Sequence, residues 1–238
     1  FQSFQLDPSI DKALVAMGFL KPTPIQQKAI PLAMSNKDLI GCAQTGTGKT
    51  AAFCIPILME LLKSPDKIAL VMAPTRELVQ QIEAFWRNLT KFNPNMHCVS
   101  LIGGLPMNGQ LRALAKKPRF IVATPGRLVD HLQRRTVNLN QAKILVLDEA
   151  DRMLDMGFAP QLAQVLRFVP KARQTLFFTA TWDTNVDQLA KRYLKDAVLV
   201  SIGAVSQAAS TIEQSLISTT AQGKNNTLLD ELEQRQGS

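Results

Sequence analysis

Apolar residues along this chain gather in short continuous runs, separated by longer amphipathic stretches. A continuous run, unlike an alternating one, indicates a strand that is buried on both faces, as in a parallel sheet covered by helices. The runs that predict strands are Asp38–Cys42, Lys67–Ala73, Arg119–Ala123, Lys143–Leu147, Gln174–Phe178 and Ala197–Ser201.

The stretches between these runs carry helix signals. Asp7 can cap a helix with Pro8 at its first position, and Gly18 is placed to end it. Thr23-Pro24 repeats the start signal before Ile25–Met34. Further helices are expected at Gly48–Leu62, Thr75–Lys91, Pro125–Arg134 and Thr184–Leu194. The alternation predicts an α/β fold, a three-layer sandwich with a mostly parallel sheet and helices on both faces.

The pattern changes after Ile202. Residues 203–210 are small and polar, which indicates a linker. Thr211–Thr219 then predicts one strand and Lys224–Gln234 one helix, too little to bury a core. We therefore expect one domain over residues 1–202 and the truncated start of a second domain over residues 211–238.

The composition narrows the class of protein. The chain has 238 residues, 46% hydrophobic and 19% charged, as a compact soluble domain does. Its net charge of +8 favours a polyanionic partner, although a merely soluble basic surface is the competing interpretation. Cys42, Cys54 and Cys98 show no paired spacing, which favours reduced thiols in a cytoplasmic protein over a disulfide framework.

Two further classes are disfavoured. His97 and His131 lack partners at ligand spacing, which argues against a zinc site. No apolar run is long enough to span a bilayer and no signal-peptide pattern is present, so we expect no membrane association.

A glycine-rich loop follows the first strand-like run, at Ala43–Thr50. Such a loop at the start of a helix offers backbone N–H groups to phosphates. Ala43 stands where the common pattern has glycine, but Gly46 and Gly48 remain where backbone must approach phosphate closely. Lys49 can then reach the β- and γ-phosphates of a nucleotide, and Thr50 can ligate Mg²⁺.

Acidic residues close the run Ile144–Leu147. Asp148 comes at the carboxyl end of the strand, where ligands bind in open α/β sheets, and can hold Mg²⁺. Glu149 can orient or deprotonate an attacking water, whereas Asp151 can equally cap a helix. Together with the glycine-rich loop, these acids predict a nucleoside triphosphate site whose catalytic residues are Lys49, Asp148 and Glu149.

On these residues the chain resembles the DEAD-box RNA helicase family, from Phe1 to about Ser201, the family's first RecA-like P-loop NTPase domain. Gly18–Gln26 is similar to the Q motif, which implies that Gln26 reads adenine; helix patterning alone makes it an ordinary polar residue. The family's adenine-stacking aromatic falls at Phe1, seventeen residues before Gly18. The nucleotide-binding residues implied by the resemblance are Phe1, Phe19, Lys21, Thr23, Gln26, Gln44, Thr45, Gly46, Thr47, Gly48, Lys49, Thr50 and Ala51.

Three more segments resemble the family's RNA-binding motifs: Pro74–Leu78 motif Ia, Gly103-Gly104 the glycine doublet, and Thr124–Arg127 motif Ib. Hydroxyls, guanidiniums and helix N-terminal amides bind phosphate without reading bases. Taken singly, Arg76 or Arg127 is more often a solvated or salt-bridged arginine, but the position after a strand-like run, on the side of the sheet where ligands bind, favours a ligand role. The RNA-binding residues implied by the resemblance are Pro74, Thr75, Arg76, Gly103, Gly104, Thr124, Pro125, Gly126 and Arg127.

Thr179-Ala180-Thr181 resembles motif III, which usually starts with serine. The retained hydroxyl allows hydrogen bonds to the acidic segment, and the resemblance assigns Asp151, Thr179, Ala180 and Thr181 to coupling ATP turnover to strand separation. A plain strand end is the competing interpretation. No counterpart of the family's arginine finger follows Thr219, so we expect this chain alone to hydrolyse ATP poorly.

The sequence thus predicts the N-terminal core domain of an ATP-dependent RNA helicase that uses ATP and Mg²⁺. The parent protein would close two domains over single-stranded RNA or a short RNA duplex and open it locally. We expect a monomeric cytoplasmic chain whose partners are RNA and the second RecA-like domain. Two alternatives remain: a non-catalytic RNA- or nucleotide-binding module, and a DNA-directed helicase-like ATPase, because only contacts to the 2′-OH separate RNA from DNA.

Overall fold

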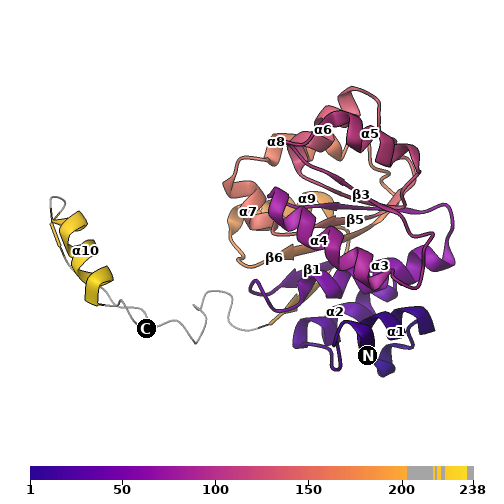
Figure 1. Ribbon diagram of the computed structural model, residues 1–238, viewed down its shortest axis with the longest axis horizontal. Coiled ribbons are helices and arrows are strands. Elements are labelled where there is room, and N and C mark those ends of the chain that lie inside the picture. The colour runs from indigo at the N-terminus through magenta and orange to yellow at the C-terminus, as the bar shows by residue number, and fades with distance from the viewer. Residues whose placement is uncertain (203–216, 218, 221–222, 235–238) are drawn as a thin grey trace. The chain divides into compact units, whose positions relative to one another are not determined.

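The structure is a computed structural model that describes residues 1–202, 217, 219–220 and 223–234 (Figure 1). The chain divides into two units, Phe1–Val205 and Ser206–Ser238. In the second unit, α10 (Lys224–Gln234) coincides with the predicted helix. The predicted linker at 203–210 lies outside the described residues, as does most of the strand predicted at Thr211–Thr219.

The first unit is built on a seven-stranded sheet in the order β3-β4-β2-β5-β6-β1-β7. All of its strand pairs are parallel. The predicted α/β sandwich is therefore confirmed, with an all-parallel sheet. The strands are β1 (Leu39–Cys42), β2 (Ile68–Met72), β3 (Cys98–Leu101), β4 (Phe120–Ala123), β5 (Ala142–Leu147), β6 (Gln174–Thr179) and β7 (Val198–Ser201).

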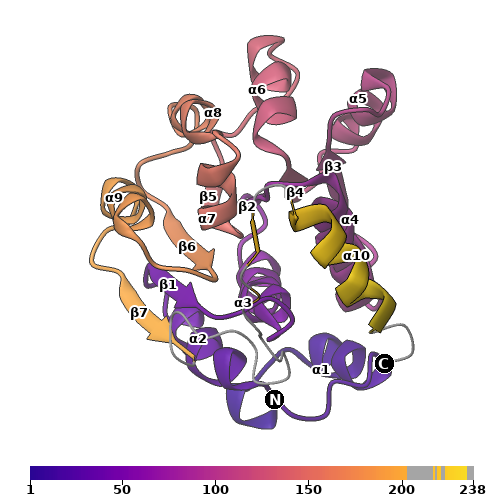
Figure 2. The same ribbon diagram turned by 90° about the vertical axis from the view of Figure 1, so that its left-hand side faces the viewer.

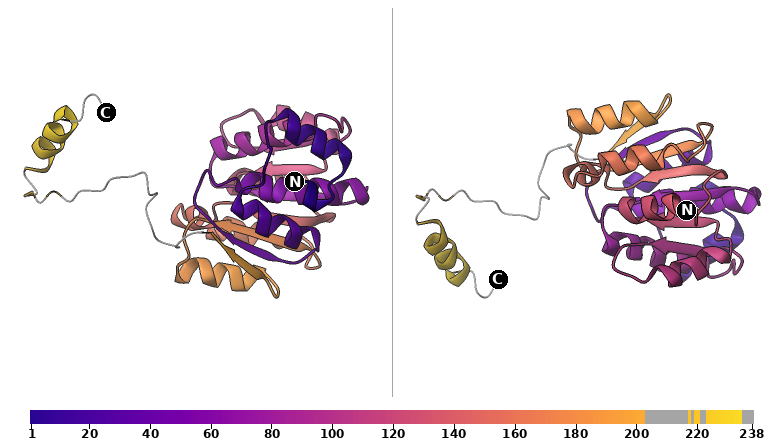
Figure 3. Two further views of the ribbon diagram at one scale, coloured as in Figure 1. Left: turned by 90° about the horizontal axis from the view of Figure 1, so that it is seen from below. Right: turned by 90° about the horizontal axis from the view of Figure 1, so that it is seen from above.

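Alternate residues of β2, β4, β5 and β6 face two separate cores, as the period of a strand requires. In β2, Val71 packs in the core that α1–α4 cover, whereas Leu70 and Met72 pack in the core under α5–α9. Figures 1 and 2 show these helix layers on opposite sides of the sheet, and Figure 3 gives two further views of them. The helices are η1 (Gln2–Phe4), α1 (Pro8–Ala16), α2 (Pro24–Met34), α3 (Lys49–Lys63), α4 (Arg76–Leu89), α5 (Met107–Ala115), α6 (Pro125–Gln133), α7 (Ala150–Asp155), α8 (Ala159–Val165) and α9 (Thr184–Tyr193).

The predicted helix starts hold at the residue level. The Asp7 carboxylate accepts the Ser9 N–H at 2.9 Å, and Pro8 is the first residue of α1. Gly18 ends that segment with a φ of +77°, a conformation that glycine adopts without strain. Among the described residues, no helix is both long and apolar enough to cross a membrane.

Five elements were absent from the sequence prediction, namely η1, β3, α5, α7 and α8. Strand β3 lies at the edge of the sheet and is buried only at alternate residues, so it lacks the continuous apolar run of an inner strand. Helix α5 contains Gly109, which weakens a helix signal, and α7 and α8 are only 6 and 7 residues long. Strand β3 forms by pairing with β4, whereas α5, α7 and α8 form because their apolar residues pack against the sheet.

Candidate functional site

The predicted site segments that follow strands all lie along the side of the sheet where the parallel strands have their carboxyl ends. The strand order divides these segments into two halves. Strands β5, β6 and β1 are neighbours, and they lead into Asp148–Asp151, Thr179–Thr181 and the glycine-rich loop. Strands β3, β4 and β2 are neighbours too, and they lead into Gly103-Gly104, Thr124–Arg127 and Pro74–Arg76. Since ligands bind at this edge in open α/β sheets, the order creates two adjoining sites.

The glycine-rich loop folds around its own lysine. Gly46 and Gly48 have φ values of +79° and +94°, which favour glycine. Lys49, the first residue of α3, is 6% exposed, and its Nζ donates to the Ala43 carbonyl at 2.6 Å. Thr47 Oγ1 closes the turn by donating to the Gln44 carbonyl at 2.7 Å. A buried ammonium needs negative charge beside it, so the loop is suited to an anion.

Gln26 joins the Q-like segment to this loop. Its side chain is 1% exposed; Oε1 accepts the Thr23 N–H at 2.9 Å and Nε2 donates to the Gly48 carbonyl at 3.1 Å. A Cβ on Gly48 would overlap Gln26 Nε2, so this contact requires glycine. To read an adenine, Gln26 must use its second N–H or lone pair, or release one of these contacts.

Aromatic rings surround the start of the chain. The Phe1 ring centroid lies 6.0 Å from that of Phe4 and 6.4 Å from that of Phe19. Phe19 in turn lies 5.8 Å from Phe85 of α4. Phe1 is thus half-buried beside the Q-like segment, while Lys21 is exposed. The stacking of Phe1 on adenine stays a prediction.

The two acids at the end of β5 have different surroundings. Asp148 is 2% exposed; burial raises its pKa to about 7, and the nearby Lys49 ammonium acts in the opposite direction. Glu149 adopts a φ of +51°, and its Oε2 accepts a hydrogen bond from Arg152 Nη1 at 3.2 Å. The turn therefore leaves one carboxylate buried near Lys49 and pairs the other with an arginine.

These groups fit a nucleoside triphosphate with Mg²⁺. A buried carboxylate at this position favours a cation beside it, and the oxygens of Asp148 and Thr50 are of the kind that Mg²⁺ prefers. Mg²⁺ commonly takes few protein ligands and completes its shell with phosphate and water. The predicted loop residues not yet placed are Thr45, which is exposed, Thr50, which is half-buried, and Ala51, which is buried.

Asp151 ties the acidic segment to the end of β6. Its Oδ2 accepts the N–H groups of Ala180 and Thr181 at 3.1 and 2.9 Å and the Thr181 hydroxyl at 2.9 Å. Burial would raise the pKa of Asp151, but these hydrogen bonds and one from the Arg152 backbone outweigh it and lower the pKa. The Thr179 hydroxyl, which was expected to bond to the acidic segment, instead donates from Oγ1 to the Thr181 carbonyl at 2.8 Å, and the hydroxyl that reaches Asp151 is that of Thr181. The position that caps α7 is Glu149, so Asp151 is better described as a connector than as the cap.

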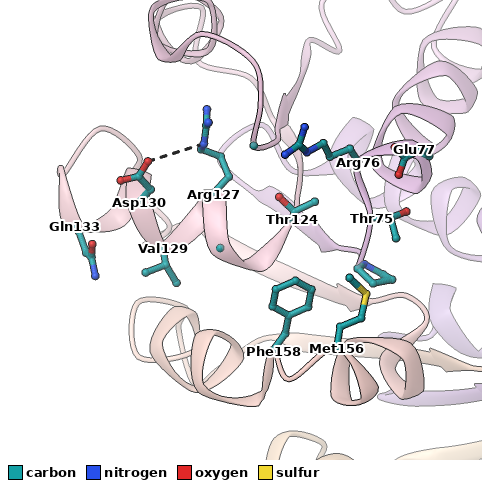
Figure 4. A pocket seen from close by; sticks show the side chains of 13 residues that line it. Thr75, Arg76, Glu77, Thr124, Arg127, Val129, Asp130, Gln133, Met156 and Phe158 are labelled. Atoms are coloured by element: carbon teal, nitrogen blue, oxygen red, sulfur yellow. Dashed lines mark ion pairs between the residues drawn. The ribbon is translucent and has the colours of Figure 1, made fainter.

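In the other half of the edge, a groove of about 730 Å³ runs between the ends of β2 and β4 and the segment after α7 (Figure 4). It collects most of the residues predicted to bind phosphates: Pro74, Thr75, Arg76, Gly103, Thr124, Gly126 and Arg127. Gly104 and Pro125 adjoin it without lining it. The side chains in Figure 4 come from segments far apart in the sequence and converge on one space.

Arg76 lies directly over the glycine doublet. A Cβ on Gly104 would overlap its Nη1, and a Cβ on Gly103 would lie 3.4 Å from its Nη2. Arg127 reaches the same loop from α6, because its Nη1 donates to the Leu105 carbonyl at 3.1 Å. Two guanidiniums from different elements therefore flank a stretch of backbone without bulky side chains.

The groove also has an apolar wall that the sequence analysis missed. Met156 and Phe158 follow α7 and face Arg76, Thr124 and Arg127 across the groove (Figure 4). Met156 is 49% exposed, which is high for a large apolar side chain. The signal in the sequence was an apolar pair around Gly157 directly after the acidic segment; it could have been noticed but has no phosphate chemistry.

Comparisons with known proteins agree with this layout. The ATP-dependent rRNA helicase RRP3 of Pyricularia oryzae is 46% identical over 204 residues, which cover 85% of this chain and 38% of that protein. The DEAD-box ATP-dependent RNA helicase CshA of Bacillus subtilis is 43% identical over 231 residues, 96% of this chain and 46% of its own length. The chain thus spans less than half the length of these two relatives.

A solved structure shares the fold. The crystal structure of a hypothetical ATP-dependent RNA helicase from Sulfolobus tokodaii superposes with a TM-score of 0.76 at 32% sequence identity, covering 83% of this chain and 57% of that one. The sequence profile described as DEAD/DEAH box helicase matches residues 23–189. That range holds the glycine-rich loop, the acidic segment and every residue that lines the groove. This chain belongs to the DEAD/DEAH box helicase family.

Proposed function

We propose that this chain binds ATP with Mg²⁺ and single-stranded RNA side by side, as the first RecA-like domain of an ATP-dependent RNA helicase. The observation that carries the proposal is the strand order, which puts the glycine-rich loop and Asp148 in one half of the edge and the groove in the other. The relatives named as RNA helicases support the same function.

In the nucleotide half, Lys49 compensates the charge of the β- and γ-phosphates, and Thr50 and Asp148 hold Mg²⁺. Glu149 orients the attacking water and accepts its proton. Its ion pair with Arg152, which is 57% exposed, must yield for this role. Gln26, next to the loop, supports the preference for adenine.

In the RNA half, Arg76 and Arg127 bind consecutive phosphates, while backbone amides near Gly103 and Gly104 allow close approach of the sugar-phosphate chain. The apolar wall of Met156 and Phe158 packs against sugars or bases. Because the polar contacts are with the backbone, RNA binding is nearly independent of base sequence.

The two halves communicate through Asp151 and α7 in this proposal. Asp151 holds Ala180 and Thr181, and α7 leads within a few residues to Met156 and Phe158 in the groove. A change at Glu149 on nucleotide turnover can therefore shift the groove wall. A second RecA-like domain would complete both sites, and we propose a cytoplasmic protein that is monomeric apart from its RNA.

Two binding measurements on this chain test the proposal. Calorimetry with ADP and GDP should show a preference for ADP, and fluorescence anisotropy should show binding of labelled oligouridylate at low salt. Absence of both would remove the proposed function. The same assay with oligodeoxythymidylate addresses the DNA-directed alternative, since equal affinity would leave RNA without an advantage.

The non-catalytic alternative needs a turnover assay. We expect RNA-stimulated ATP hydrolysis from the chain joined to its second domain, and a version without Glu149 as base serves as the blank. No stimulation above that blank would favour a binding module.

A further inference from the structure

A buried network of hydrogen-bonded polar side chains lies behind the groove, and the proposed function gives this network no role. His131 of α6 is 0% exposed, and its Nε2 lies 3.2 Å from Oε1 of Gln110 in α5. Gln110, 5% exposed, donates from Nε2 to the Ile102 carbonyl at 3.1 Å. On its other side, His131 Nδ1 lies 2.8 Å from Thr136 Oγ1.

A neutral His131 imidazole can make all the hydrogen bonds of this network. Because the amide N–H of Gln110 is directed at Ile102, its oxygen must accept, and His131 Nε2 must carry the hydrogen. Nδ1 then accepts the Thr136 hydroxyl when that hydroxyl turns away from its other acceptor, the His131 backbone carbonyl at 3.0 Å. Burial lowers the pKa of His131, with Arg127 acting in the same direction, and both effects favour this neutral form.

The position of this network matters because of the two elements that it connects. The Ile102 carbonyl directly precedes Gly103, the glycine whose backbone lies against Arg76. His131 is on the same helix as Arg127, one turn further along. The network therefore links the glycine-doublet loop to α6, behind the exposed contact of Arg127 with the Leu105 carbonyl.

Neither Gln110 nor His131 lines the groove. An apolar pair of similar size could fill their volume, but it would leave the Ile102 carbonyl without its partner. Buried, fully paired polar groups fix one arrangement of the elements that they join, because a shifted arrangement breaks their hydrogen bonds. Here the elements joined are the two that carry the groove's backbone loop and one of its arginines.

We propose that Gln110 and His131 are positioning residues for RNA binding, which hold the glycine-doublet loop at a fixed distance from α6 so that Arg76 and Arg127 meet the same run of phosphates. This inference rests on the proposed function of the groove. The residues act through the loop and touch neither RNA nor nucleotide.

The test compares five variants of this chain by anisotropy with oligouridylate, calorimetry with ADP and thermal unfolding. His131→Leu and Gln110→Met remove the hydrogen bonds at similar volume and should weaken RNA binding about threefold to tenfold, the range for residues that act at a distance. ADP affinity should change less than about twofold, since the nucleotide half is untouched. His131→Gln keeps an N–H near the place of Nε2 and should restore RNA affinity.

Leu132→Ala is the matched control, because Leu132 is a 5% exposed apolar residue of the same helix. It should lower the unfolding temperature without a comparable loss of RNA affinity. The double variant His131→Leu/Gln110→Met should lose no more RNA affinity than either single variant, since the two residues belong to one hydrogen-bonded network. If His131→Leu does not fold, Gln110→Met with His131→Gln carries the same comparison.

The outcomes separate the two levels of inference. Failure of the unmodified chain to bind oligouridylate would overturn the proposed function of the groove and the positioning role with it. Binding by the unmodified chain with equal affinity in Gln110→Met would overturn the positioning role alone. So would a loss in Leu132→Ala as large as that in His131→Leu, or a failure of His131→Gln to restore binding.

Discussion

At the scale of single residues, the nucleotide half separates binding from chemistry. Lys49 is buried with its ammonium inside the loop, whereas Glu149 has its carboxylate on Arg152. In the chain joined to its second domain, Lys49→Ala should reduce ATP affinity at least about tenfold, because it removes the cation at the terminal phosphates. Glu149→Gln should bind ATP normally and slow single-turnover hydrolysis about a hundredfold or more, because it removes a base. Normal hydrolysis by Glu149→Gln would show that the base is elsewhere.

Gln26 allows a second prediction. Gln26→Ala should lower ADP affinity and reduce the preference for ADP over GDP, because it removes the side-chain amide and its hydrogen bond to the Gly48 carbonyl. Gln27→Ala is the control, since Gln27 is exposed and, among the described residues, its side chain donates only to the Pro22 carbonyl. Calorimetric titration of both variants decides the matter. A preference for ADP that survives in Gln26→Ala would leave Gln26 as a structural clamp of the loop.

How well the sequence predicted a residue depended on where its partners come from. Lys49, Asp148 and Glu149 follow strand-like runs within a few positions, so their chemistry could be derived from local spacing. The contact of Gln26 with Gly48 could not, because it joins residues 22 positions apart that the fold brings together. Met156 and Phe158 were missed because apolar residues carry no binding signal until a groove is seen.

At the scale of elements, the prediction was good for inner strands and poorer at the edge. Strands β1, β2, β4, β5 and β6 were predicted to within one or two residues, because burial makes these inner strands continuously apolar. The edge strand β7 was predicted as well, since its sequence is continuously apolar although Leu199 is exposed. The omission of β3 had a consequence for the site. Strand β3 leads into the glycine doublet, and its parallel pairing with β4 is what brings that loop beside α6.

Helix α6 provides a third prediction, on pH. Burial lowers the pKa of His131 below its ordinary 6.5, with Arg127 and Arg134 acting in the same direction and Asp130 against them. Below pH 6.5 the unfolded chain then binds a proton that the folded chain does not, so stability falls as pH falls through this window. One proton accounts for at most about 1.4 kcal/mol per pH unit.

Urea unfolding at a series of pH values, from about 7.5 to about 5, measures this contribution. Because other groups titrate too, the quantity of interest is the difference between the unmodified chain and His131→Gln. We expect the difference in stability to shrink as pH falls. A difference that is constant over the window would mean that His131 titrates as in the unfolded chain.

At the scale of the whole molecule, strand order is what makes one domain hold two sites. The crossovers that place β5, β6 and β1 together, and β3, β4 and β2 together, cannot be read from hydrophobic patterns, which give strands but not their neighbours. Motif spacing along the chain likewise does not say which motifs share a site. The family resemblance divided the motifs into a nucleotide-binding and an RNA-binding set, and the structure adds that the two sets lie in adjoining halves, with β2 and β5 as the border.

The net charge of +8 supplies RNA affinity that does not depend on any one contact. The last prediction therefore concerns how much of the salt dependence a single arginine contributes. Within the described residues, Arg76 makes no ion pair or side-chain hydrogen bond that would compete with a phosphate. Arg76→Ala should therefore reduce the log–log dependence of RNA affinity on salt by about 0.7, the value for one phosphate of a single strand. Arg127→Ala should reduce the slope by less, because Arg127 Nε already lies 3.9 Å from Asp130 Oδ2, and it should also lose the contact with Leu105.

The control is Arg134→Ala, since Arg134 is 62% exposed, pairs with Asp130 and does not line the groove. It should change overall affinity slightly through net charge and leave the slope as it is. Anisotropy over a salt series, with oligouridylate and with a mixed sequence, measures both quantities. The loss in Arg76→Ala should be similar for the two RNAs, because phosphate contacts carry no base information. An unchanged slope in Arg76→Ala, or a loss confined to one RNA, would take Arg76 out of the phosphate-binding groove and leave it as packing for the glycine doublet.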